Sequence, residues 1–151
     1  MAVKPIAIIA VFAIAVGGFV LATQWDDGPQ AQQARSGTRP VAQQDAPLVN
    51  IVMPDDLGAM AQIGARVFNA TCASCHGENA VGRNGAGPPL IHKIYEPSHH
   101  GDGAFHLAVQ NGVRAHHWRF GDMPPQTGLT RAEVDAIVAF VRQVQTENGI
   151  N

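Results

Sequence analysis

The chain has 151 residues, a length that suits one domain with a single hydrophobic core. Its formal net charge is −2 and its pI is about 6.3, so the charge balance favours neither nucleic acid nor a polyanion as a partner. Charged residues make up only 15% of the chain, in part because the N-terminal segment is strongly apolar.

An uncharged apolar segment spans residues 5–22. As a helix it would reach about 27 Å, close to the hydrocarbon thickness of roughly 30 Å. Lys4 precedes it and Trp25 follows it at the expected membrane interface. Positively charged ends stay in the cytoplasm, so the rest of the chain is expected to lie outside it. A cleaved signal peptide is the alternative, but its apolar part is usually shorter. We therefore expect residues 1–23 to form a retained transmembrane anchor.

A linker is predicted at residues 24–50, which are rich in Gln, Ala, Gly and Pro and show no apolar period. Such a segment cannot bury enough surface to offset its chain entropy. As a flexible tether it would let an attached domain reach two partners within a confined radius. A simple spacer is the alternative.

Residues 51–151 are predicted to form an all-helical domain, because helical periods occur in them and strand patterns do not. The first helix is expected to start at a cap on Asp55 or Asp56 and to run to about Asn69. Its apolar residues at helical spacing are Leu57, Met60, Ile63 and Val67.

Two further helices are predicted downstream. A middle helix should run from about Asp102 to Asn111 and end at Gly112. The C-terminal helix should begin after Thr130, because Thr130 and Glu133 have the spacing of a capping box. Its expected buried stripe is Val134, Ile137, Val138 and Val141.

The most specific motif is Cys-Ala-Ser-Cys-His at residues 72–76, a C-x-x-C-H run typical of c-type haem attachment. Two thiols on one helical turn can form thioethers to one haem, and the adjacent His76 can then ligate the iron. A redox dithiol would need a βαβ context, and a zinc site would need two more ligands at short spacing. Neither is present near Cys72 and Cys75, so one covalent haem c is expected.

A second ligand candidate is Met123, the only methionine after this motif. It lies in Gly-Asp-Met-Pro-Pro at residues 121–125, where two prolines predict a stiff loop rather than a helix. A thioether on such a loop suits the sixth position of the iron. A core methionine is the ordinary alternative.

Together these motifs make residues from about 55 to 146 resemble a class I c-type cytochrome of the monohaem, membrane-anchored type. The resemblance implies an all-α fold around one covalently bound haem with His76 and Met123 as iron ligands. It also implies export, so the expected location is the inner membrane with the haem domain in the periplasm. A soluble periplasmic protein is the alternative if the N-terminal segment is cleaved.

The resemblance assigns further residues. The run Gly-Ala-Gly-Pro-Pro-Leu at 85–90 is similar to the G-x-G-P-x-L of that family, in which the Pro88 carbonyl accepts the Nδ1 proton of His76. Trp118 is similar to the aromatic residue near a haem propionate. Gly64 matches the small residue at the crossing of the terminal helices, with Phe140 as its aromatic partner. An ordinary turn and a core tryptophan are the alternatives for Pro88 and Trp118.

The chain has six histidines besides His76, which is more than the resemblance predicts. Neighbouring residues on a helix point about 100° apart, so adjacent histidines rarely chelate one ion. We therefore expect the pairs His99/His100 and His116/His117 to be solvated loop residues. His116 or His117 remains a rival iron ligand.

The predicted function is one-electron transfer between redox proteins, not enzymatic catalysis. A soft thioether favours Fe(II), and six-coordinate iron leaves no position for oxygen. The same fold could serve as the haem subunit of a larger membrane oxidoreductase. A haem sensor or peroxidase-like enzyme would require an easily displaced Met123.

Overall fold

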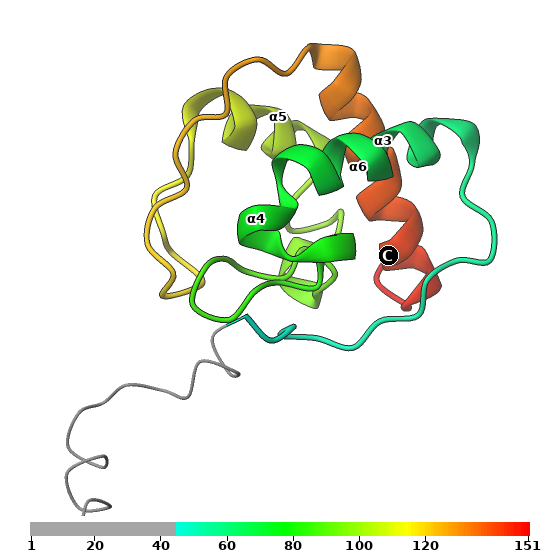
Figure 1. Ribbon diagram of the computed structural model, residues 1–151, viewed down its shortest axis with the longest axis horizontal. Coiled ribbons are helices and arrows are strands. Elements are labelled where there is room, and N and C mark those ends of the chain that lie inside the picture. The colour runs from blue at the N-terminus through cyan, green and yellow to red at the C-terminus, as the bar shows by residue number, and fades with distance from the viewer. Residues whose placement is uncertain (1–44) are drawn as a thin grey trace, which may run out of the picture. The chain divides into compact units, whose positions relative to one another are not determined.

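The computed structural model describes residues 45–151, and the expected membrane span and most of the expected linker lie outside them (Figure 1). The described residues form helices and loops without any strand, in agreement with the predicted all-α domain. Within them, no helix is both long and apolar enough to cross a membrane. The elements are α3 (Ala59–Thr71), α4 (Ala73–His76), the 3₁₀ turns η1 (Glu78–Ala80) and η2 (Lys93–Tyr95), α5 (Asp102–Asn111) and α6 (Arg131–Glu147).

Helices α3 and α6 cross closely and form the core of the domain (Figure 1). A Cβ atom on Gly64 would collide with the backbone of Ala136, so only glycine permits this crossing. The buried rings of Phe68 and Phe140 pack beside it with centroids 5.7 Å apart. The expected close approach at Gly64 is therefore present, but Phe140 pairs with Phe68 and the partner of Gly64 is helix backbone.

The start of α3 differs from the prediction. The helix begins at Ala59 after Gly58, and neither Asp55 nor Asp56 caps it. No side chain caps the helix; instead Gln143 of α6 holds the backbone just before it through a tertiary contact. Its Oε1 accepts from the Gly58 N–H at 3.0 Å, and its Nε2 donates to the Asp56 carbonyl at 2.8 Å.

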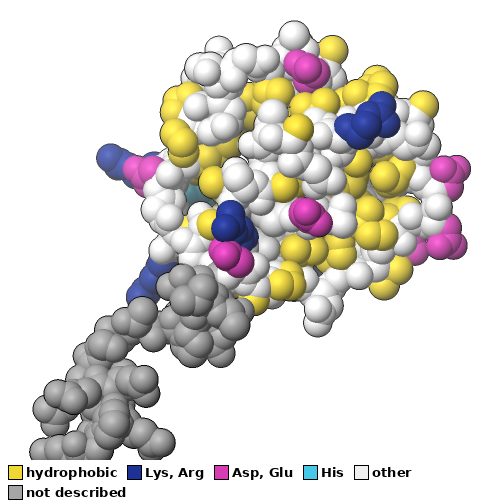
Figure 2. Space-filling model, viewed as in Figure 1, with side chains coloured by type: hydrophobic (Ala, Val, Ile, Leu, Met, Phe, Trp, Pro, Cys, Tyr) yellow, Lys and Arg dark blue, Asp and Glu magenta, His cyan; other side chains and the backbone are white. Residues whose placement is uncertain are grey.

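The buried face of α3 is also rotated from the expected stripe. Ala61, Gly64 and Phe68 are buried, whereas Met60 is 54% exposed and Ile63 is 44% exposed. Close backbone packing at Gly64 decides this orientation, since small residues let α3 approach α6. Met60 and Ile63 therefore add to the exposed apolar surface of the domain, and the face drawn in Figure 2 carries hydrophobic side chains with only scattered charges.

Helix α6 is as predicted. Thr130 Oγ1 accepts from the Glu133 N–H at 3.3 Å, and the Glu133 carboxylate accepts from the Thr130 N–H at 2.7 Å. The carboxylate also accepts from the Thr130 hydroxyl at 2.8 Å, and the two bonds that it accepts, from the N–H and then from the hydroxyl, hold the pKa of Glu133 below its usual value. The predicted stripe is buried, and it consists of Val134, Ile137, Val138 and Val141.

Helix α5 also has the predicted bounds, and it ends where Gly112 adopts a φ of 73°. A side chain at Gly112 would collide with the Met123 carbonyl oxygen, so this glycine also admits the loop that carries Met123. The end of α5 thereby fixes one wall of the site described below.

The domain makes contacts before its expected boundary at residue 51. The backbone N–H groups of Leu48 and Val49 donate to the Val81 carbonyl at 3.1 and 3.3 Å. Asp45 accepts from Arg83 Nε at 2.7 Å. Residues 45–50, assigned to the linker from composition, are thus fastened to the loop after the C-x-x-C-H motif.

Candidate haem site

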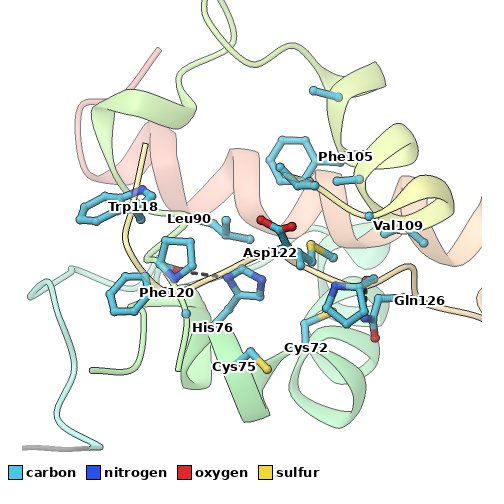
Figure 3. Close-up of a pocket in the computed structure, with 18 of the residues that line it drawn as sticks. Cys72, Cys75, His76, Leu90, Phe105, Val109, Trp118, Phe120, Asp122 and Gln126 are labelled. Atoms are coloured by element: carbon cyan, nitrogen blue, oxygen red, sulfur yellow. Dashed lines mark hydrogen bonds between the residues drawn. The ribbon is translucent and has the colours of Figure 1, made fainter. Parts of the chain in front are cut away.

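The C-x-x-C-H motif lies at the junction of α3 and α4. The Cys72 N–H still donates to Phe68 at the end of α3, while the Cys72 carbonyl accepts from the N–H groups of Cys75 at 3.1 Å and His76 at 2.9 Å. This single turn brings both thiols and the imidazole to one cavity, with Cys72 half-buried and Cys75 exposed (Figure 3).

The environment of Cys72 does not suit a reactive dithiol. Burial raises the pKa of the Cys72 thiol, an effect that the Thr71 hydroxyl, 3.3 Å from the sulfur, partly opposes. Redox-active and nucleophilic cysteines have lowered pKa values, because they react as thiolates. The raised pKa of Cys72 therefore argues against a thiol–disulfide exchange centre.

His76 is held in one orientation by the loop at residues 85–90. Its Nδ1 lies 2.9 Å from the Pro88 carbonyl oxygen, so Nδ1 carries the proton and Nε2 keeps the lone pair (Figure 3). The hydrogen bond implied by the resemblance is thus present. Burial lowers the pKa of His76, and the bond to Pro88 opposes this shift, so burial favours the neutral imidazole that can ligate a metal. Gly87 lies so close to Cys75 that a Cβ would come 2.7 Å from the Cys75 carbonyl oxygen.

Met123 reaches the same cavity from a loop that several hydrogen bonds hold in place. Its N–H and carbonyl exchange hydrogen bonds of 2.9 Å with Val113, and this isolated bridge closes the loop over residues 114–122. Inside that loop, the Asp122 carboxylate accepts from the Ala115 N–H at 2.8 Å. The loop is therefore stiffened by backbone pairing as well as by the two prolines after Met123.

The cavity between these elements has a volume of about 480 Å³ and mostly apolar walls. Figure 3 shows Phe105 and Val109 of α5 on one side of His76, and Trp118 and Phe120 on the other. Cys72, Cys75, His76, Pro88, Trp118 and Met123 all line it. Every site residue chosen from the sequence thus contributes to one cavity, which is the arrangement that a covalently bound apolar cofactor requires.

One buried polar atom in this wall lacks a partner. Among the described residues, only Trp118 Nε1 is a buried side-chain nitrogen or oxygen atom without a hydrogen bond. Burial raises the pKa of the nearby Tyr95 phenol, and the Trp118 indole partly offsets that shift. The two groups are therefore close, but without hydrogen-bond geometry the desolvation penalty of Nε1 persists. A propionate at the cavity rim would supply the missing acceptor, so the residues present fit a haem.

A family model described as Cytochrome c matches residues 61–145, which include the attachment motif, the Met123 loop and most of α6. The chain belongs to the cytochrome c family. It therefore carries covalently bound haem c and acts as a haem-based electron carrier with redox protein partners. No curated protein and no solved structure matches the chain.

The sequence did not reveal one polar network that supports this cytochrome site. Arg142 of α6 donates to the Tyr95 carbonyl at 2.7 Å and to the His100 carbonyl, and it pairs with Asp102 at 2.8 Å. Fully buried Gln145 donates to the Leu90 carbonyl at 2.8 Å. One feature of the sequence could have indicated this network. Gln145 is a polar residue on the apolar stripe of α6, four residues after Val141.

The structure also changes the interpretation of the histidine pairs. The rings of His99 and His100 lie against that of His117, although about seventeen residues separate the two pairs in the chain. His116 lies beside them, with its ring centroid 4.2 Å from that of His117. The four rings therefore form one cluster between two loops rather than two separate pairs. His99, His116 and His117 are exposed, as expected for loop residues, whereas His100 is half-buried.

Proposed function

We propose that this cytochrome is a periplasmic one-electron carrier whose haem iron is ligated by His76 and Met123. The observation that carries the proposal is the single cavity lined by both cysteines, His76 and Met123. Cys72 and Cys75 would hold the cofactor through thioethers, and the Pro88 carbonyl orients Nε2 of His76 toward it. Trp118 would donate its free indole N–H to a propionate.

The bound haem supplies the iron that changes oxidation state, and the protein controls its surroundings. A thioether from Met123 favours Fe(II) and raises the reduction potential relative to two imidazole ligands. The pinned loop limits movement of Met123 between redox states, and the apolar cavity wall excludes water. With His76 and Met123 both holding the iron, no position would remain for oxygen, and electron transfer would be the chemistry that the haem supplies.

The test of this function is Met123→Leu, which keeps side-chain volume and removes the sulfur. Haem should remain attached, and the midpoint potential should fall by more than about 60 mV, a tenfold change for one electron. The ferrous variant should bind carbon monoxide, whereas the wild type should not. Carbon monoxide binding by the wild type would instead support a sensor or peroxidase-like role.

We further propose that residues 1–23 anchor the protein in the inner membrane. The support is the uncharged apolar segment with Lys4 before it and Trp25 after it. The haem protein should then remain in the membrane fraction after a carbonate wash. A mature N-terminus at Thr23 in soluble protein would contradict the anchor, and migration within a larger complex would favour the subunit alternative.

A further inference from the structure

We propose that His99, His100 and His117 bind a divalent transition-metal ion, of the class of Zn²⁺ or Cu²⁺, at a site separate from the haem iron. One ligand nitrogen from each residue lies within 4.8 Å of those of the other two. The two loops that carry them are the turn before α5 and the loop that leads to Met123.

The spacing of the nitrogens is close to what such an ion needs. Zn–N bonds of about 2.0–2.1 Å place tetrahedral ligands about 3.3 Å apart. The ring centroids of His99 and His100 are 4.6 Å apart, and each lies 5.2 Å from that of His117. Small side-chain rotations close the remaining gap, because His99 and His117 are exposed.

The turn that carries the first pair is already held in place. Its Glu96 carbonyl accepts from the N–H groups of His99 at 3.0 Å and His100 at 2.8 Å. Arg142, which lies on α6, donates a hydrogen bond to the His100 carbonyl. His100 Nδ1 lies 2.6 Å from the Ile94 carbonyl oxygen, which fixes the tautomer and leaves Nε2 free as a ligand. Histidine ligands of metals are commonly oriented by such a bond.

The ligand chemistry selects the class of ion. Three imidazoles without a carboxylate suit zinc, copper and nickel rather than calcium or magnesium. The crowding also lowers the pKa of His117 through desolvation and then through His116, His100 and His99, which favours the neutral ligand form. Three histidines leave a fourth position for water.

The site adjoins the haem cavity without using any residue assigned to the haem. His100 and His117 are among the residues that line that cavity, and His117 is followed directly by Trp118. A bound ion would tie the turn before α5 to the loop that carries Met123. Binding should therefore raise the melting temperature of the haem-loaded protein by mass action.

The test uses the full-length, haem-loaded protein without a histidine tag, titrated with Zn²⁺ in a calorimeter. We expect one ion per protein, with affinity reduced at least tenfold in His99→Ala and in His117→Ala. His106→Ala is the matched control, because His106 lies on α5 and pairs with Asp135 at 2.8 Å. It should bind Zn²⁺ like the wild type. Zinc-edge X-ray absorption should show three imidazole nitrogens at about 2.0 Å.

Several results would overturn the proposal. They are undetectable binding at about 1 mM Zn²⁺, equal affinity in His99→Ala and the wild type, and a coordination shell dominated by oxygen. A changed ferrous haem spectrum in metal-free His117→Ala would also overturn it, because His117 would then be an iron ligand. Unchanged spectra in both variants would exclude misfolding as the cause of lost binding.

Discussion

At the residue scale, two side chains of the site each keep one ring nitrogen available for a bound group. His76 uses Nδ1 on Pro88 and keeps Nε2 available, while Trp118 keeps a buried N–H without an acceptor. Buried polar groups without partners are costly in a folded protein. A bound haem would give both groups a partner and would therefore also stabilise the folded protein.

The role of Trp118 is tested by Trp118→Phe, which keeps an aromatic ring and removes the donor. The propionate would lose a hydrogen bond to its charged form, so the pKa of that propionate should rise. The midpoint potential should fall by no more than about 60 mV, and its pH dependence should move to higher pH. Voltammetry over a pH series measures both effects. Identical curves for the two proteins would remove Trp118 from the propionate contact.

At the element scale, the crossing of α3 and α6 positions the attachment turn. Phe68 is buried against Phe140, and its carbonyl accepts from the Cys72 N–H, so the crossing sets where the motif begins. Gly64 permits that crossing because a side chain there would meet the Ala136 backbone. Changes at the crossing should therefore affect the stability of the whole haem domain.

Gly64→Ala and Gly103→Ala separate steric fit from helix propensity. Both glycines lie in helices, but a Cβ on Gly103 would have no atom within 4 Å. Gly64→Ala should lower the free energy of unfolding by about 1–3 kcal/mol through overpacking. Gly103→Ala should leave it unchanged or raise it by up to about 1 kcal/mol. Guanidinium unfolding followed by haem absorbance measures the difference, and equal effects would argue against a close crossing.

At the scale of the whole molecule, local motifs predicted much more than long-range packing. The bounds of α5, the capping box of α6 and the His76–Pro88 bond follow from short patterns or a family motif. The start of α3 did not, because it has no side-chain cap and Gln143, 85 residues from Gly58 in the chain, holds the backbone that precedes it. The histidine cluster was missed for the same reason, since chain folding unites two separate pairs.

The central claim is that His76 and Met123 ligate one haem in an electron carrier. Proton NMR of the ferrous protein tests it most directly, because the haem ring current shifts the methyl resonance of an axial methionine far upfield. The account predicts this resonance in the wild type and its loss in Met123→Leu, with haem still attached. A wild-type spectrum without it, or its persistence in Met123→Leu, would contradict the account.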